Sequence, residues 1–247
     1  MARRVRRMSY KIVQKGNQHT NSSSRDGHIP YVIVNHISAG SMGSMDNWFT
    51  SSGNKVSSAH FGVSKKGEIH QYVPIERMAW ANGLSKWEQL NAKADVVRNN
   101  PSLNPNKYTV SIEHEGTDGQ LTDAQFAATV WLHKYIQSEI KRLYGRDMKL
   151  NEYHVIGHFQ VDPKRKPYCP GTKFPWDQLY KELKKVGVTK VEQQKVKVLV
   201  NGKMVADGYL DGGTTYTPSR AVAEALGASV RWDKDNLTVH ITKEDNK

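Results

Sequence analysis

Three side chains of types that bind zinc lie far apart in the sequence, each beside a segment that predicts a strand or a tight loop. His36 lies near the end of an apolar run, His158 directly follows another, and Cys169 lies in Tyr168-Cys-Pro-Gly171. A catalytic zinc site takes three nitrogen, sulfur or oxygen ligands and leaves one position open for water. The same spacing also fits a packed cysteine with two hydrogen-bonded histidines. Taken alone, the spacing favours that simpler interpretation.

The remaining histidines give weaker signals. His154 and His158 are four residues apart, which suits a pair of zinc ligands on one helix, but the Val-Ile-Gly between them argues against a helix. His133 lies in a predicted helix and His240 in a predicted half-exposed strand, where neither needs a special role. No function is assigned to His60 or His70.

The elements that would position these side chains follow from the apolar pattern. The Gly- and Ser-rich stretch 38–44 predicts a loop, and Ser64-Lys-Lys-Gly67 predicts a hairpin turn between two strands. Strands are predicted where β-branched and apolar residues cluster or alternate, at residues 31–37, 59–63, 68–73, 107–113 and 153–157.

One long helix is predicted after Leu121. Thr122 is its expected N-cap, with Gln125 at the capping-box position, and Gly145 is its expected C-terminal stop. The apolar residues recur at steps of four, four and three, so they share one face: Leu132, Ile136, Ile140 and Leu143. A short closing helix is predicted over residues 176–185.

The order of elements predicts an α/β domain followed by a small α+β module. We expect a basic N-terminal extension and lead-in over residues 1–27, the main domain over 28–185, a linker over 186–194 and the module over 195–243. Within the module the pattern predicts a strand ending in an Asn-Gly turn at 195–202, a helix over 218–227, and a hairpin of 228–232 with 237–241.

The charge is positive and uneven. Residues 1–194 hold 28 Lys and Arg against 17 Asp and Glu, whereas residues 195–247 hold 8 against 7. Such an excess attracts polyanions, which include nucleic acids and the anionic polymers of a bacterial wall. No base-reading motif supports specific nucleic-acid binding. The lone Cys169 excludes an intrachain disulfide.

No targeting segment is evident. The arginines of the N-terminal head (Arg3, Arg4, Arg6 and Arg7) are not followed by the apolar run of a signal peptide. No stretch approaches the roughly 20 apolar residues of a membrane span. We therefore expect a soluble, monomeric chain that is cytoplasmic when synthesised.

An ordered set of short segments resembles the type-2 N-acetylmuramoyl-L-alanine amidases, which include many phage endolysins and the peptidoglycan recognition proteins. The resemblance covers roughly residues 28–185 and implies a mixed central β-sheet flanked by helices. The segments are Tyr31-Val-Ile-Val-Asn-His36, Ser57-Ser-Ala-His-Phe-Gly-Val63, Gly67-Glu-Ile-His-Gln-Tyr-Val73, Ala79-Trp-Ala-Asn-Gly83, Ser111-Ile-Glu-His-Glu-Gly116, Gly157-His158 and Cys169-Pro-Gly171.

This resemblance implies roles for five residues. His36, His158 and Cys169 match the zinc ligands of the family, and Glu113 matches a glutamate that acts as the catalytic base in some members. Glu115 is the alternative base, because it would share a strand face with Glu113 if the strand continued. Lys166 lies near a lysine that stabilises the oxyanion, in a register uncertain by one residue.

Two positions depart from the family pattern. Ala59 stands where some relatives have a catalytic tyrosine, so a tyrosine-based role is absent. The usual Ala-Trp-His-Ala-Gly is Ala-Trp-Ala-Asn-Gly here, which removes any substrate contact by that histidine. Trp80, Trp87 and Tyr72 could line a groove for sugar and peptide or pack in the core.

The C-terminal module resembles the small N-terminal domain of copper amine oxidases, in Lys197-Val-Leu-Val-Asn-Gly202, Thr217-Pro-Ser-Arg220 and Leu226 to Trp232. It has no cluster of copper ligands. It could bind the cell wall, where a second weak contact on one tether raises avidity, or it could be a stabilising appendage.

The resemblance implies zinc-dependent hydrolysis of the amide bond between N-acetylmuramic acid and L-alanine in peptidoglycan. We expect a phage or prophage endolysin that reaches the wall after release by another factor. Three alternatives stay open: a peptidoglycan-binding protein of the same fold that does not cut, a basic nucleic-acid-binding protein, and a thiol hydrolase with Cys169 as its nucleophile.

Overall fold

The computed structural model of the chain describes residues 10–185, 194–211, 214–234, 236 and 238–243. It divides into two compact units, Met1–Val191 and Glu192–Lys247. The arginines of the predicted basic head and most of the predicted linker 186–194 lie outside the described residues.

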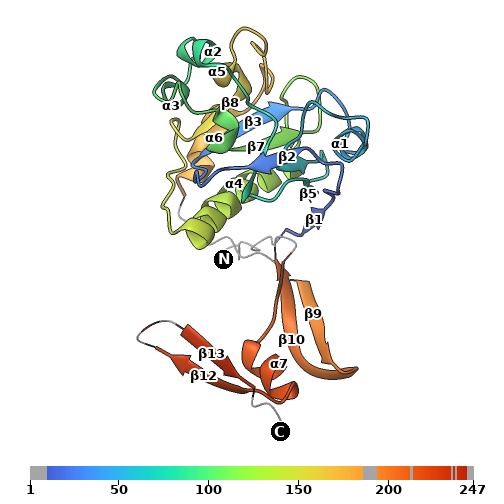
Figure 1. The fold of residues 1–247 in the computed structure, drawn as a ribbon. Coiled ribbons are helices and arrows are strands. Elements are labelled where there is room, and N and C mark those ends of the chain that lie inside the picture. Colours follow the sequence, from blue (N-terminus) through green and yellow to red (C-terminus); the bar gives the residue numbers. More distant parts are fainter. Residues whose placement is uncertain (1–9, 186–193, 212–213, 235, 237, 244–247) are drawn as a thin grey trace, which may run out of the picture. The chain divides into compact units, whose positions relative to one another are not determined.

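The first unit is built on a six-stranded sheet with the order β1-β5-β4-β7-β3-β8 (Figure 1). β4 and β5 are antiparallel, as the predicted hairpin requires, and the other neighbouring pairs are parallel. A separate antiparallel pair joins β2 to β6. The strands are β1 (Ile12–Gln14), β2 (Ser22–Ser24), β3 (Val32–Ile37), β4 (Phe61–Val63), β5 (Ile69–Gln71), β6 (Arg77–Ala79), β7 (Thr109–His114) and β8 (Val155–Gly157).

Helices cover both faces of this sheet. On one face Ile33, Phe61 and Ile112 pack with Leu132 of α4 and Leu179 of α6. On the other face the alternate residues of β3, Val32 and Val34, pack with Val96 and Val97 of α3. The helices are α1 (Met42–Phe49), α2 (Lys86–Leu90), α3 (Asp95–Arg98), the 3-10 helix η1 (Pro105–Lys107), α4 (Asp123–Tyr144), α5 (His158–Val161) and α6 (Trp176–Leu183). The predicted mixed sheet flanked by helices is confirmed.

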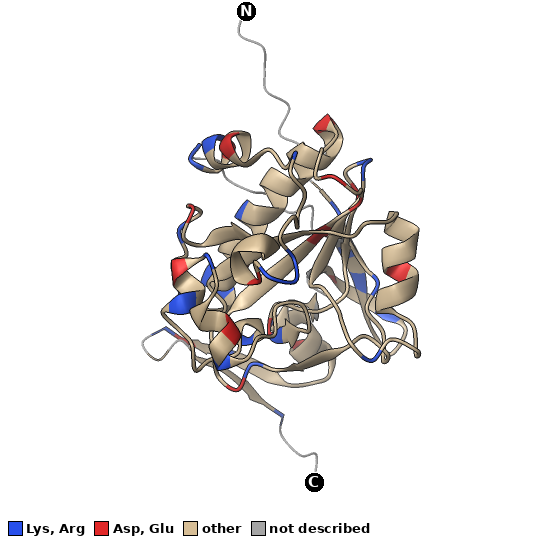
Figure 2. Cartoon of the chain, turned by 90° about the horizontal axis from the view of Figure 1, so that it is seen from above, with Lys and Arg blue, Asp and Glu red and all other residues tan. Residues whose placement is uncertain are grey.

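Charged residues lie on the helices and loops around the sheet, with acidic positions interspersed among the basic ones (Figure 2). Ion pairs such as Lys107–Asp26 and Lys173–Asp118, each at 2.8 Å, neutralise some of these charges locally and leave the net positive charge unchanged. No helix within the described residues is long and apolar enough to cross a membrane.

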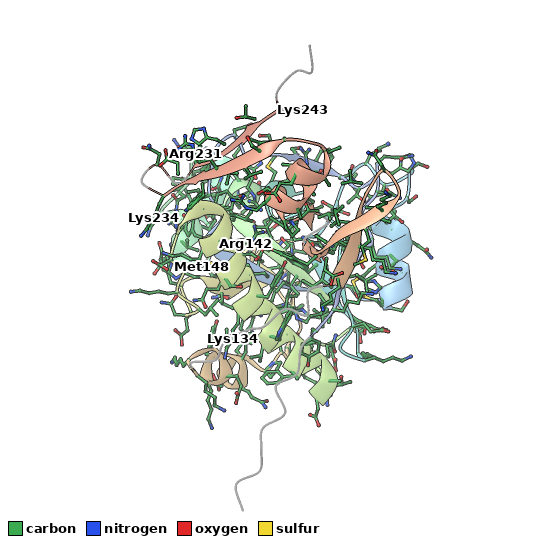
Figure 3. The ribbon with its side chains drawn as sticks, turned by 90° about the horizontal axis from the view of Figure 1, so that it is seen from below. Lys134, Arg142, Met148, Arg231, Lys234 and Lys243 are labelled. Atoms are coloured by element: carbon green, nitrogen blue, oxygen red, sulfur yellow. The ribbon has the colours of Figure 1, made fainter. Side chains whose placement is uncertain are left out.

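α4 is the predicted long helix, and both of its predicted ends are confirmed. The Thr122 side chain accepts a hydrogen bond from the Gln125 backbone N–H, and Gly145 ends the helix in the left-handed conformation with a φ of 67°. Figure 3 looks onto this helix, with Lys134 and Arg142 marked along it. Its apolar face packs under the strands that carry the candidate site residues.

Two predictions for the first unit are wrong. The stretch 38–44 is not all loop, because α1 begins at Met42 with Ser41 as its N-cap and buries Met42, Met45 and Phe49. These three residues occupy one helical face, a spacing that the surrounding Gly and Ser residues obscured.

The main domain also starts before residue 28. β1 pairs with β5 at the edge of the central sheet, and β2 pairs with β6. Arg25 is 3% exposed. The segment 10–27 is therefore part of the domain and not an extension or lead-in.

The second unit contains the predicted elements. β9 (Gln194–Val200), β10 (Lys203–Asp211) and β11 (Thr214–Tyr216) form one sheet, α7 (Ser219–Ala225) is the predicted helix, and β12 (Ser229–Asp233) with β13 (Thr238–Thr242) is the predicted hairpin. Its described side chains are mostly exposed, and Trp232 and Ile241 are 51% and 54% exposed.

Arg25 gives a test of the corrected boundary. Its guanidinium donates to the carbonyl oxygens of Ile75, Asn106, Lys107 and Thr109 at 2.8 to 3.0 Å. Arg25→Met leaves these buried acceptors without a donor and is expected to lower the free energy of unfolding by roughly 3 kcal/mol, measured by urea denaturation. Arg146→Met, at an exposed arginine, should change it by less than about 1 kcal/mol. Equal effects of the two substitutions would contradict the assignment of residue 25 to the folded domain.

Candidate active site

Parallel pairing of β3 with its two neighbours brings the predicted site residues to one level of the sheet. His36 on β3 is in register with Glu113 on β7. On the other side Asn35 pairs with Gly157 of β8, so His158 follows at the next position as the first residue of α5. Residues separated by more than 70 positions in the sequence therefore meet at the carboxyl ends of adjacent strands.

His36, His158 and Cys169 form one cluster. One potential ligand atom from each lies within 4.8 Å of the other two. The two imidazole rings meet edge to face with 4.4 Å between their centroids. Among the described residues, no group hydrogen-bonds to the buried Nε2 of His36. The donor set of two imidazoles and one thiol suits zinc.

The loop that carries Cys169 is hydrogen-bonded to β3 and to α5. The Ile37 backbone N–H donates to the Cys169 Sγ at 3.4 Å, and the Phe159 N–H donates to the Cys169 carbonyl at 2.8 Å. Gly171 follows with a φ of 113°, and a Cβ there would lie 2.2 Å from the Asp118 carbonyl carbon. Only glycine lets the Cys-Pro-Gly segment pack this closely.

Burial shifts the protonation of each group in the cluster. It lowers the pKa of His158 to about 4, with a further contribution from Lys166, and lowers the pKa of His36 well below its usual value. Burial and then the Glu113 charge raise the pKa of the Cys169 thiol to about 12. The two imidazoles are therefore neutral at pH 7, as metal ligands must be.

Glu113 lies beside this cluster and Glu115 does not. The Glu113 Oε1 is 3.9 Å from the His36 Nδ1, and burial raises the pKa of this carboxyl to about 7 while Lys166 opposes the shift. β7 ends at His114, so Glu115 does not continue the strand. Its carboxylate instead accepts a hydrogen bond from the Lys65 N–H at 2.7 Å. Of the two predicted candidates, only Glu113 is in position to act on a group at the cluster.

Lys166 borders the same space. It is exposed, it lies in the loop between α5 and Cys169, and its backbone carbonyl accepts a hydrogen bond from the Cys169 N–H at 3.2 Å. Its charge acts on His36, His158 and Glu113. The predicted oxyanion role needs a cation close to the reacting carbonyl, and this position is compatible with that role.

A cleft of about 610 Å³ opens over the cluster. His36, Glu113, His158, Lys166 and Cys169 line one part of it, and α1 contributes Ser44, Met45, Trp48 and Phe49 to another. Of the aromatic residues considered for a groove, Trp80 lines the cleft, Tyr72 is buried at 3% exposure, and Trp87 is 74% exposed outside it. Trp48 was missed because its helix was not predicted.

The other histidines are held elsewhere. The His60 Nδ1 accepts from the Ser111 N–H at 3.0 Å, and His154 contacts Asn151 at 2.7 Å. His154 therefore does not pair with His158, as the Val-Ile-Gly spacer indicated. His70 contacts Asp46 on α1 at 2.8 Å.

A profile of the N-acetylmuramoyl-L-alanine amidase family, Amidase_2, matches residues 25–172. That match spans more than half of the sequence. The chain belongs to this amidase family.

Individual relatives are more distant. The chain is 28% identical over 128 residues to the 1,6-anhydro-N-acetylmuramyl-L-alanine amidase AmpD of Haemophilus influenzae, covering 51% of this chain and 59% of the relative. It is 30% identical over 120 residues to the AmpD of Escherichia coli K12, covering 48% and 54%. The chain thus spans little more than half the length of the curated relatives it matches.

A solved structure shares the fold of this amidase-family chain. The crystal structure of a selenomethionine derivative of AmpD aligns with a TM-score of 0.52 at 23% identity, over 71% of this chain and 99% of that one. Residues 190–247 match the profile of the copper amine oxidase N-terminal domain, so the resemblance predicted for the second unit is also confirmed.

Two buried histidines support the candidate site from the opposite face of the sheet. His114 contacts the His36 carbonyl at 2.9 Å through Nδ1 and the Thr129 hydroxyl at 3.1 Å through Nε2. His133 donates from Nδ1 to the Thr129 carbonyl at 2.8 Å and accepts at Nε2 from the Asn35 amide at 3.2 Å. Asn35 is adjacent to His36, so these contacts hold the end of β3 in place.

His133 makes stability depend on pH. Burial lowers its pKa to about 4, whereas the unfolded value is about 6.5. Between these values only the unfolded chain binds the proton, so the free energy of unfolding falls as the pH falls from about 6.5 to 4, by roughly 3 kcal/mol for this group. His133→Gln should show a shallower decline in urea denaturation across that range. Parallel pH profiles for the two proteins would contradict this assignment.

Proposed function

We propose that the chain hydrolyses the amide bond between N-acetylmuramic acid and L-alanine in peptidoglycan, with zinc held by His36, His158 and Cys169. The observation that carries this proposal is the cluster of those three residues at a cleft that also holds Glu113. Membership of the amidase family and the names of the relatives support the same bond.

The residues of the cluster suit the metal. The neutral imidazoles and the unpartnered His36 Nε2 offer nitrogen donors, and the Ile37 N–H points to the Cys169 sulfur, where it would stabilise a thiolate. When bound there, zinc supplies Lewis acidity towards the attacking water and the scissile carbonyl. A thiol-hydrolase role for Cys169 is less well supported, because burial raises the pKa of this thiol to about 12 and so disfavours a free thiolate nucleophile at neutral pH.

The other site residues would move protons and stabilise charge. Glu113 would take a proton from the attacking water as its oxygen bonds to the carbonyl carbon. The same carboxyl would return that proton to the alanine nitrogen as the carbon–nitrogen bond breaks. Lys166 would stabilise the negative charge that develops on the carbonyl oxygen. The products are a free muramic acid carboxylate and a stem peptide with a free L-alanine amine.

We also propose that the substrate is the intact wall and that cleavage lyses the cell, as an endolysin does after its release from the cytoplasm. The second unit and the excess of positive charge in residues 1–194 support a large anionic substrate. The name of the AmpD relatives instead specifies a 1,6-anhydro-muramyl peptide. A soluble fragment of that kind is the second candidate substrate.

The test is mass spectrometry of the products released from purified peptidoglycan and, separately, from a soluble 1,6-anhydro-muramyl peptide. We expect stem peptides that begin with L-alanine from the intact polymer, lost on chelation and regained with zinc. Cleavage of the soluble fragment alone would overturn the proposed lytic role. Retained binding to the wall with no products would favour the non-catalytic binding protein.

Glu113 and Glu115 form a matched pair for testing the proposed base. Glu113→Gln removes the proton acceptor at the cluster and is expected to lower kcat about a hundredfold or more, with zinc content unchanged. Glu115→Gln is expected to keep kcat within about twofold, because its carboxylate contacts Lys65 away from the cleft. The comparison measures the rate at which each zinc-loaded variant produces the free L-alanine amine of the stem peptide. A larger loss of activity in Glu115→Gln would contradict the assignment.

A further inference from the structure

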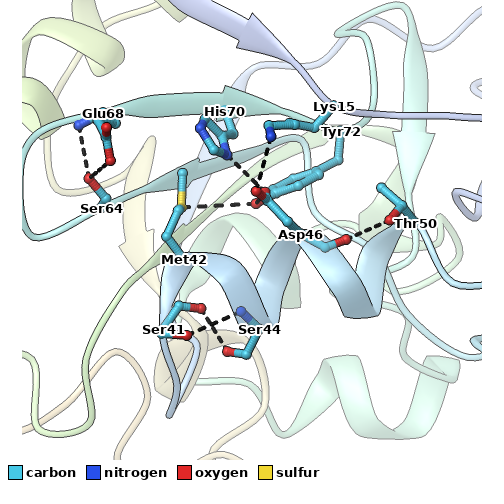
Figure 4. Close-up of polar contacts among 10 residues, drawn as sticks. All are labelled: Lys15, Ser41, Met42, Ser44, Asp46, Thr50, Ser64, Glu68, His70 and Tyr72. Atoms are coloured by element: carbon cyan, nitrogen blue, oxygen red, sulfur yellow. Dashed lines mark hydrogen bonds and ion pairs between the residues drawn. The ribbon is translucent and has the colours of Figure 1, made fainter.

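Away from the cluster of His36, His158 and Cys169, one acidic residue on α1 contacts three donors that lie near the edge of the sheet (Figure 4). The Asp46 Oδ1 accepts hydrogen bonds from the Tyr72 hydroxyl and the His70 Nδ1, both at 2.8 Å. The Lys15 Nζ lies 3.3 Å from Oδ2. Burial would raise the pKa of Asp46, but the hydrogen bonds from His70 and Tyr72 outweigh it and lower that pKa. The carboxylate form therefore holds all three contacts at neutral pH.

The sequence makes room for this network with a glycine next to Glu113. Gly62 on β4 is in register with His70 on one side and Glu113 on the other. A Cβ at Gly62 would lie 3.0 Å from the Tyr72 hydroxyl and 3.1 Å from its ring. Because side chains at paired positions share a sheet face, the Tyr72 ring occupies the space over Gly62, between His70 and the candidate base Glu113.

The helix held by this network forms one wall of the cleft. Met45 and Trp48, which flank Asp46 and its turn, both line the cleft, as does Phe49. The Phe49 and Tyr72 rings pack edge to face with 5.0 Å between their centroids. The end of the helix is fixed as well, because the Asp46 carbonyl accepts from the Thr50 hydroxyl at 2.7 Å. The position of this wall therefore depends on where Asp46 is held.

We propose that Asp46, with Tyr72 and His70, is a positioning network that holds the α1 wall of the cleft at its distance from Glu113 and thereby sets the affinity for substrate. This inference rests on the proposed amidase function for its kinetic consequence. Asp46 touches neither the metal cluster nor the reacting atoms, so it acts through Met45, Trp48 and Phe49. We expect that wall to contribute equally to binding of the ground state and of the transition state, so loosening it raises KM without lowering kcat.

The test compares full-length, zinc-loaded variants. Tyr72→Phe keeps the ring but removes the hydroxyl that Asp46 accepts, and Asp46→Ala removes the acceptor. Both are expected to raise KM for a soluble muramyl peptide about fivefold, with kcat within about twofold. Asp46→Asn keeps an oxygen acceptor and should restore most of the affinity. In hydrogen exchange, amides of residues 42–49 should lose protection about tenfold in Tyr72→Phe, with the other helices of the first unit unchanged.

Glu68→Gln is the control on the same hairpin. Its carboxylate contacts the Ser64 hydroxyl at 3.1 Å, away from α1, so KM and exchange should match the wild type. A fall in kcat with KM unchanged in Tyr72→Phe would overturn the proposal, because the network would then act on Glu113. Loss of protection throughout the first unit, or unchanged protection in α1, would also overturn it. If the wild type releases no stem peptide, the proposed function fails. Hydrogen exchange of the α1 amides in Tyr72→Phe still decides whether the network positions the helix.

Discussion

The parallel pairing of β3 with β7 and β8 is the constraint on which the candidate site depends. It places His36 level with Glu113, and it places His158 level with His36 directly after the last pair of β3 with β8, although the chain between these residues is long. A slip of one residue in either pairing would turn these side chains to the opposite face. The alternate residue of β3, Asn35, is held beneath the sheet by His133 of α4. The register is therefore fixed from the face opposite the cleft.

This arrangement places polar groups where burial is unfavourable. His36 is 3% exposed and its Nε2 has no hydrogen-bond partner among the described residues, and the Glu113 Oε2 is equally without one. Such groups cost stability unless a ligand satisfies them. The apolar core between α4, α6 and the sheet supplies the compensating stability. The site lies at the end of the sheet, where it can keep these groups ready for a ligand while apolar clusters on both faces stabilise the fold.

Local sequence patterns predicted the helices and strands well. The resemblance to the amidase family indicated which residues would come together in the candidate site. The β-branched run at residues 31–37 and the capped helix from Thr122 to Gly145 carry their signals within a few residues, and the structure confirms both. Features built from distant partners were not predictable in this way. Arg25 looks like any surface arginine until the carbonyls that surround it are known. The contacts of Asp46 with His70 and Tyr72 bridge 24 and 26 residues, and they depend on a helix that a Gly- and Ser-rich start concealed.

We propose that two histidines and the lone cysteine of the chain bind one zinc ion. Zinc K-edge X-ray absorption of the loaded full-length protein tests it without relying on activity. We expect one sulfur scatterer at about 2.3 Å and imidazole nitrogens at about 2.0–2.1 Å, with the sulfur contribution absent in Cys169→Ser. Because Cys169 is the only cysteine, a thiolate signal can come from no other residue. A wild-type spectrum with only oxygen and nitrogen scatterers would contradict the proposed ligand set.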